Sequence, residues 1–110
     1  MTKLSQALSH IEACEFNTAK DILEDILLDD TKNVDVLYNL GMCFSELGQP
    51  LKAIKPLEQC LKHDPDYINA YVALGYAYSL LNDYEKSKDS FLEALRRDPA
   101  NPFALRNLGG

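Results

Sequence analysis

Residues 34–67 read VDVLYNLGMCFSELGQPLKAIKPLEQCLKHDPDY, and residues 68–101 read INAYVALGYAYSLLNDYEKSKDSFLEALRRDPAN. Aligned without a gap, the two segments carry related residues at the same places, which are Leu37 and Tyr71, Leu40 and Leu74, Gly41 and Gly75, Phe44 and Tyr78, Leu57 and Phe91, Cys60 and Ala94, and Asp64-Pro65 and Asp98-Pro99. Apolar and small residues that recur at a fixed period indicate a solenoid, because each unit leaves an apolar face that only its neighbour can cover. The sequence therefore predicts a repeat protein.

The repeated pattern resembles the tetratricopeptide repeat, whose unit is an antiparallel helix pair of this length with a large residue, Leu-Gly, an aromatic, and then Ala, an aromatic, Ala and Pro at set positions. The second copy has Ser87 where alanine is usual and otherwise fills these positions with Tyr71, Leu74, Gly75, Tyr78, Tyr84, Phe91, Ala94 and Pro99. The first copy departs from the pattern at Pro50 and Cys60. The resemblance implies an all-α fold, a right-handed superhelix of antiparallel helix pairs with about three units and one extra helix.

Continuing the period divides the chain into four parts, which are a degenerate N-terminal repeat at 1–33, complete repeats at 34–67 and 68–101, and the start of a further repeat or a capping helix at 102–110. An apolar stripe predicts an amphipathic helix near the N-terminus, and it fits the period only if one residue is missing from the turn that follows. At the other end, Leu105 and Leu108 are expected to be uncovered, because no second helix follows them. The chain is thus either cut from a longer array or closed by self-association.

Local signals place the helix ends in the first complete repeat. Asn33 is a good N-cap for a helix that begins at Val34, and Gly48 supplies the left-handed residue after that helix. Pro50 suits the first position of the next helix, where its missing N–H loses no hydrogen bond. Pro56 falls inside that helix and is expected to bend it, with the freed carbonyl turned to water on the outer side.

Composition narrows the classes of function. Lys and Arg number 11 against 17 Asp and Glu, a formal charge of -6, and the basic residues form no patch, which argues against nucleic-acid binding. No apolar run reaches the roughly 18 residues that a membrane span needs, and the N-terminus lacks the apolar core of a secretion signal. We therefore expect a cytoplasmic protein without membrane insertion. No catalytic or cofactor-binding motif is present, so we predict neither enzyme activity nor a cofactor.

The three cysteines are predicted to be free thiols. Cys14, Cys43 and Cys60 form no CxxC pair and are odd in number, which argues against a disulfide framework. Cys43 and Cys60 stand where the repeat needs a small residue, so packing is favoured over redox sensing. His10 precedes Cys14 by one helical turn, but no third or fourth ligand accompanies them, and we predict no metal site.

In proteins that resemble this one, the first helix of each unit lines a concave surface that binds ligands, so the resemblance implies a binding face there. The positions of these helices that are not used between units are Asp35, Tyr38, Asn39, Met42, Asn69, Val72, Ala73, Tyr76, Arg106 and Asn107. Aromatic, methionine and amide side chains together suit the side chains and backbone of a peptide. We therefore predict a protein-protein interaction module whose partner is a peptide or helical segment of another protein.

Some members of the family clamp the C-terminal carboxylate of chaperones with Lys, Asn and Arg on this face. Asn39 matches the central asparagine of such a clamp. Ser5 stands in the first unit, and Asn69 and Ala73 in a later one, where the other clamp residues are needed, and this argues against a chaperone clamp.

Two alternatives remain open at this point. Tyr38 and Tyr76 could pack only against each other and against a missing helix, without a ligand. The chain could also be a structural scaffold that stacks on itself through its exposed terminal helix, which would make it a homo-oligomer. If the groove does bind a ligand, Asp35 and Glu46 against Arg106 alone predict a ligand with neutral or basic flanks.

Overall fold

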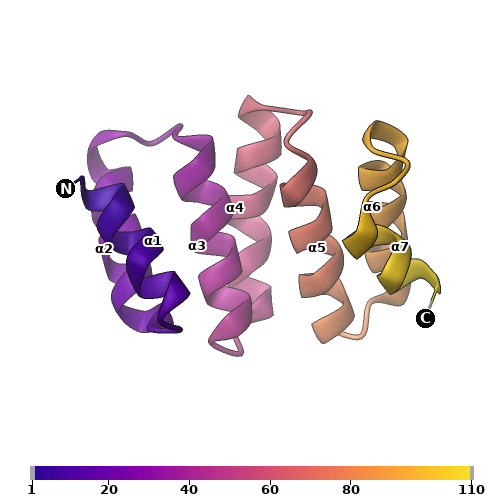
Figure 1. Cartoon of the computed structure of the whole chain (residues 1–110), viewed down its shortest axis with the longest axis horizontal. Helices are drawn as coiled ribbons and strands as arrows, with labels where there is room; N and C mark the ends of the chain where they lie inside the picture. Colours follow the sequence, from indigo (N-terminus) through magenta and orange to yellow (C-terminus); the bar gives the residue numbers. More distant parts are fainter. Residues whose placement is uncertain (1, 110) are drawn as a thin grey trace.

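The computed structural model describes residues 2–109, which form helices joined by short turns (Figure 1). The seven helices in this range are α1 (Lys3–Glu12), α2 (Phe16–Asp29), α3 (Val34–Glu46), α4 (Pro50–His63), α5 (Ile68–Leu80), α6 (Tyr84–Arg97) and α7 (Pro102–Gly109). They pair as α1 with α2, α3 with α4 and α5 with α6, and each pair packs on the next, with α7 against α6. The molecule is an all-α helical repeat solenoid, as predicted.

Polar side chains cap several helix N-termini, where backbone N–H groups lack partners. The Asn33 side-chain oxygen accepts from the N–H of Val36 at 3.2 Å, which confirms the N-cap predicted for α3. The equivalent oxygen of Asn101 accepts from the N–H of Ala104 at 3.0 Å and caps α7. Pro50 is the first residue of α4, as predicted.

The turns inside the three pairs share one register, which corrects an expectation. Cys14, Gly48 and Asn82 lie one period apart and are left-handed, with φ of 59°, 75° and 62°. In each turn, this residue's N–H donates to the carbonyl three residues earlier, and the next N–H donates to the carbonyl five residues earlier. The prediction of a missing residue before α2 is therefore wrong. The first pair differs by a shorter α1, with 10 residues against 13 in α3.

The two helices of a complete pair approach closely because a glycine of the first helix faces a large side chain of the second. A Cβ at Gly41 would lie 2.5 Å from Cγ of Leu57, and a Cβ at Gly75 would lie 2.6 Å from ring carbons of Phe91. Leu57 and Phe91 are buried in the clusters that fill the solenoid. The Leu-Gly of the repeat pattern thus marks the contact that brings each pair together.

Contacts account for two departures from the repeat pattern. The buried Ser87 hydroxyl donates to the carbonyl of Gly75 at 2.7 Å, so its polar atom is satisfied. The Pro56 ring is buried inside α4 and borders a surface hollow that Leu40 and Phe44 of α3 also line. The sequence predicts an effect of Pro56 on curvature alone, whereas the buried ring also contributes to packing.

The last helix is covered more than its sequence predicts. Ala104 is fully buried with Phe91, and Leu108 packs against the same cluster. Leu105 is 49% exposed, so the prediction of an uncovered leucine is confirmed there and wrong for Leu108.

We expect Gly75→Ala to destabilise the protein. Alanine is favoured over glycine in a helix by about 1 kcal/mol, whereas overpacking a core costs about 1–3 kcal/mol. Because the added Cβ would overlap the ring of Phe91, the overlap should dominate and lower the urea midpoint. Lys88→Ala on the exposed side of α6 is the control and should change stability by less than about 0.5 kcal/mol. A raised midpoint for Gly75→Ala would show that the pair is not held at this contact.

Candidate functional site

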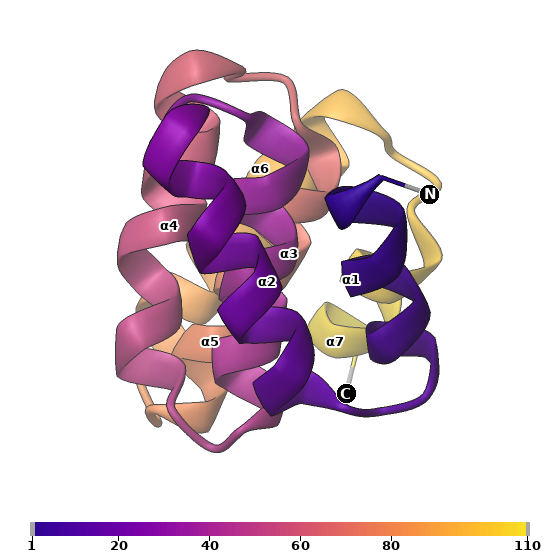
Figure 2. The same cartoon turned by 90° about the vertical axis from the view of Figure 1, so that its left-hand side faces the viewer.

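One face of the solenoid is formed by the first helices of the pairs. α1, α3 and α5 stand side by side along the long axis, and α7 continues the row (Figure 1). Seen from the α1 end, α1 and α7 lie on one side of the stack and α4 lies on the other (Figure 2). Side chains from several units can therefore meet on the first-helix face.

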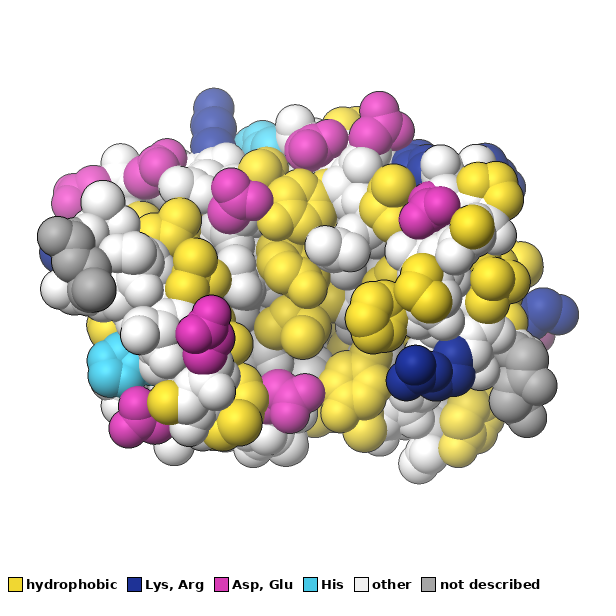
Figure 3. Space-filling view, in the orientation of Figure 1, with side chains coloured by type: hydrophobic (Ala, Val, Ile, Leu, Met, Phe, Trp, Pro, Cys, Tyr) yellow, Lys and Arg dark blue, Asp and Glu magenta, His cyan; other side chains and the backbone are white. Residues whose placement is uncertain are grey.

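A groove of about 450 Å³ lies on this face, between α3, α5 and α7. Its lining residues are Tyr38, Met42, Glu46, Asn69, Val72, Ala73, Tyr76, Phe103 and Asn107. Apolar side chains form a column over the middle of this face in the space-filling view (Figure 3). Phe103 is 55% exposed and Tyr76 is 36% exposed, so two aromatic rings meet solvent in the groove.

The structure brings together seven of the ten residues predicted for the concave face, which are Tyr38, Met42, Asn69, Val72, Ala73, Tyr76 and Asn107. The other three lie outside the groove lining, and two of these make hydrogen bonds within the protein, one local and one between units. The Asn39 amide donates to the backbone carbonyl of Asp35 at 2.8 Å. The Asp35 carboxylate accepts from the Tyr67 hydroxyl at 2.7 Å. The Arg106 guanidinium lies 6.0 Å from the centre of the Phe103 ring and so borders the groove.

Sequence reasoning missed Phe103 as a lining residue and gave Glu46 only a flanking role. The signal for Phe103 was available, because it occupies the same repeat position as Asp35 and Asn69, two residues that were predicted. Glu46 is the last residue of α3, and its side chain lines the groove beside Met42. The larger of the two exposed aromatic surfaces was therefore overlooked.

Tyr67 links two units and supports the groove wall. It precedes α5 at the position where Asn33 and Asn101 cap their helices, yet it makes no side-chain cap bond. Its ring lies 5.4 Å from the Tyr38 ring, centre to centre, with a 40° tilt. Burial, followed by the hydrogen bond to Asp35, raises the pKa of Tyr67. Tyr38 thus packs against Tyr67, a contact that neither alternative included.

All three cysteines are free thiols, of which Cys14 is exposed and Cys43 and Cys60 are buried. Burial raises the pKa of the Cys43 thiol to about 11, and the negative charge of Glu46 adds to the shift. Burial likewise raises the pKa of Cys60 to about 11. Both thiols are therefore protonated and unreactive near neutral pH.

Within residues 2–109, no group of three His, Cys, Asp or Glu is placed to hold a metal ion, and no helix is long and apolar enough to cross a membrane.

The fold and the repeated contacts define a helical repeat protein, and comparison with known proteins identifies the family. The chain matches the tetratricopeptide repeat over residues 34–67 and again over residues 68–101, which together exceed half of its length. This chain belongs to the tetratricopeptide repeat family.

The sequence identity between this chain and individual relatives is low. Over 106 residues the chain is 31% identical to the uncharacterized protein ycf37 of Guillardia theta, covering 96% of this chain and 58% of the relative. It is 29% identical over 74 residues to the Hsp70-Hsp90 organizing protein of Triticum aestivum, covering 67% of this chain and 13% of that protein. The chain thus spans less than two thirds of either relative.

Among solved structures, the second TPR domain of human RPAP3, determined in complex with the HSP70 peptide SGPTIEEVD, is similar with a TM-score of 0.92. The two are 20% identical, and the likeness covers 97% of this chain and 89% of that one. At this identity the similarity establishes the fold and not the ligand.

We expect Tyr67→Phe to lower the free energy of unfolding by about 1 kcal/mol at neutral pH, because it removes the bond to Asp35. In the folded state the pKa of Tyr67 lies above its ordinary value of 10.0. The unfolded chain therefore loses this proton first, and the free energy of unfolding falls as pH rises above about 10. The advantage of the wild type over Tyr67→Phe should shrink in that range.

Urea unfolding at several pH values would measure this difference. Tyr84→Phe is a matched control, because its exposed hydroxyl donates only to Asn82, two residues away. It should change stability by less than about 0.5 kcal/mol. Equal stability of Tyr67→Phe and wild type at neutral pH would contradict the role of Tyr67 as a link between units.

Proposed function

We propose that the protein is an interaction module whose groove binds a peptide or helical segment of another protein. The observation that carries the proposal is the exposure of Tyr76 and Phe103 on the walls of one apolar groove. Large apolar side chains gathered in a concave surface favour a ligand, because covering them removes apolar area from water. The proposal assigns a binding role and no catalytic one.

The composition of the groove suits a peptide. Met42 and Val72 supply adaptable and branched apolar surface, while the amides of Asn69 and Asn107 can bond to a peptide backbone. The opening lies between three helices, α3, α5 and α7, so an extended or helical segment can lie across them. The relatives support the class of function, since the RPAP3 domain is bound to a peptide.

The self-association alternative has weaker support. It rests on an exposed face of α7, and Leu108, one of the two leucines expected on that face, packs against the cluster around Phe91. Peptide binding is therefore the function that the geometry favours.

Loss of the two exposed aromatic rings should weaken peptide binding. We expect Tyr76→Ala with Phe103→Ala to reduce affinity at least about tenfold, because buried aromatic anchors contribute about 2 kcal/mol or more to such interfaces. The measurement is calorimetry with synthetic peptides selected on the wild-type protein from a random display library. Circular dichroism would establish that the double variant remains folded.

Tyr84→Ala is the matched control, since Tyr84 is 67% exposed on α6 and lies outside the groove. It should leave the affinity unchanged. If the selected peptides bound the folded double variant as tightly as the wild type, the groove would not be the binding site.

A further inference from the structure

We propose that the groove binds a segment that carries a lysine or arginine beside its apolar residues, and that Glu12 and Glu46 together bind this cation. The inference rests on the proposed function and adds the chemistry of the ligand. It is carried by the distribution of charge on the first helices, the position of the two glutamates at helix ends, and the lack of an internal partner for either.

Charges on the groove face are separated along the solenoid. α5 contains no Asp, Glu, Lys, Arg or His, so the middle of the groove is uncharged. α3 carries only Asp35 and Glu46, both acidic, and α7 carries only Arg106. Acidic side chains lie around the apolar column on the α1 and α3 side in the space-filling view (Figure 3). A ligand that lies along this face therefore meets negative charge at one end.

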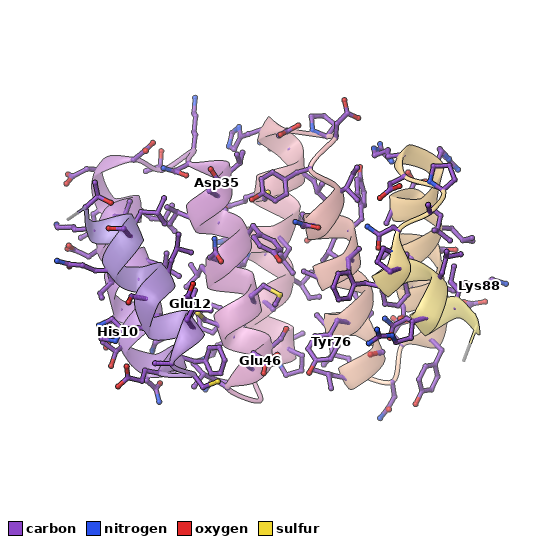
Figure 4. All side chains as sticks on the ribbon, viewed as in Figure 1. His10, Glu12, Asp35, Glu46, Tyr76 and Lys88 are labelled. Carbon is purple, nitrogen blue, oxygen red and sulfur yellow. The ribbon has the colours of Figure 1, made fainter. Side chains whose placement is uncertain are left out.

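Glu12 and Glu46 occupy the same repeat position in neighbouring units. They lie one period apart, and each is the last residue of its helix, α1 or α3. Figure 4 shows both on the face that carries Tyr76, toward the same end of the helices. Glu46 also lines the groove with Tyr76. Glu46 thus faces a cation next to the apolar ligand residues, and Glu12 lies on the same face one unit further along.

The helix ends strengthen this negative potential. The C-terminus of a helix carries the negative end of the macrodipole, and its last carbonyls lack intrahelical partners. α1 and α3 end at Glu12 and Glu46, and the last turn of α3 contains no basic residue. The carboxylates and the helix dipoles therefore act in the same direction on a bound cation. In the free protein the same arrangement is unfavourable, because each carboxylate opposes its own helix dipole.

No cation of the protein compensates for the two glutamates. Within residues 2–109, no Lys, Arg or His nitrogen lies within 4.0 Å of a carboxylate oxygen of Glu12 or Glu46. The basic groups of α1 are used elsewhere, since Lys3 pairs with an aspartate of α2 at 2.6 Å and His10 contacts Glu15 at 3.0 Å. Both carboxylates are exposed and available to a ligand.

Arg106 fixes the end at which the cation binds. Its guanidinium lies near the Phe103 ring, at the α7 side of the groove. A basic ligand residue placed there would meet a like charge, whereas α3 offers the acidic Asp35 and Glu46, and the basic Lys3 and His10 of α1 contact Asp25 and Glu15. The bound segment therefore places its lysine or arginine toward α1 and α3, with its apolar residues over Tyr76 and Phe103.

The test compares cationic and anionic peptide probes. Peptides are selected on the wild-type protein from a random display library and synthesised, and each is remade with norleucine in place of its Lys or Arg. The peptide SGPTIEEVD serves as the anionic probe. Affinities are measured by calorimetry on the wild type, on Glu12→Gln with Glu46→Gln, and on Tyr76→Ala with Phe103→Ala. Glu24→Gln with Glu58→Gln, on the exposed sides of α2 and α4, is the matched charge control.

We expect the selected peptides to contain a Lys or Arg at a fixed distance from their apolar residues. The norleucine peptide on wild type, and the selected peptide on the Glu12→Gln, Glu46→Gln variant, should each bind about tenfold more weakly at low salt. This difference should disappear near 1 M salt, where the Debye length is about 3 Å. The charge control should retain the affinity, and SGPTIEEVD should bind more weakly than the cationic peptide.

Two outcomes separate the inference from the function on which it rests. Peptides that depend on Tyr76 and Phe103 but tolerate norleucine would leave the groove function standing and overturn the cation site. If the peptides bound both double variants as tightly as the wild type, the cation site and the groove function would both be overturned. Tighter binding of SGPTIEEVD than of any cationic peptide would also overturn the inference.

A stability measurement provides a second readout. Because each glutamate opposes a helix dipole, the Glu12→Gln, Glu46→Gln variant should melt about 1–5 °C above the wild type while binding the peptide more weakly. If the two glutamates had only a structural role, their replacement would lower the melting temperature. A lower melting temperature for this variant would contradict the assignment of both carboxylates to the ligand.

Discussion

The contact between a glycine of the first helix and a large side chain of the second is the constraint on which the rest of the structure depends. Gly41 meets Leu57, and Gly75 meets Phe91, at distances that leave no room for a Cβ. Because the helices of each pair approach this closely, their remaining apolar positions can be covered by the neighbouring pair. In the first pair Ala7 takes the glycine position, and it is buried in one cluster with Leu23. A methyl group is thus accommodated in the first pair, although its second helix carries Leu23 at the repeat position of Leu57.

This packing divides the first helices into two sets of residues. One set, which includes Leu37, Leu40 and Leu74, is buried between helices and is determined by the fold. The other set lines the groove, and its exposed members, such as Tyr76 and Phe103, are less constrained by the fold, whereas Ala73 belongs to both sets. This chain shares its fold, at a TM-score of 0.92, with a domain determined in complex with the peptide SGPTIEEVD, and its own α3 carries the carboxylates of Asp35 and Glu46. Fold similarity establishes the arrangement of the helices, while the charge of the groove depends on the residues of this chain.

The fold could be predicted from the sequence because its determinants are local or periodic. Proline at the start of α4 and asparagine before α3 act within one helical turn, and the spacing of Leu-Gly gives the pairing of helices. Seven of the ten predicted concave residues line the groove for the same reason. What could not be predicted depends on contacts between units. The hydroxyl of Tyr67 reaches Asp35, 32 residues earlier in the chain, and no local rule indicates this bond. The burial of Pro56 and the covering of Leu108 likewise depend on how neighbouring helices pack.

Carboxylates at helix C-termini show where local stability and binding compete. A sequence optimised for stability alone would place basic residues there, as α4 does with Lys62 and His63 and α6 does with Arg96 and Arg97. Those two helices lie on the outer side of the solenoid, away from the groove. The first helices α3 and α5 lack basic residues in their last turns, and α3 ends instead in glutamate. The first repeat departs from this contrast, because the outer helix α2 ends at Asp29 with no basic residue in its last turn and the first helix α1 has His10 in its last turn. The contrast is confined to the two complete repeats, where α3 ends in Glu46 beside the groove. The positively charged ligand segment proposed above would supply from outside the compensation that α4 and α6 carry in their own last turns.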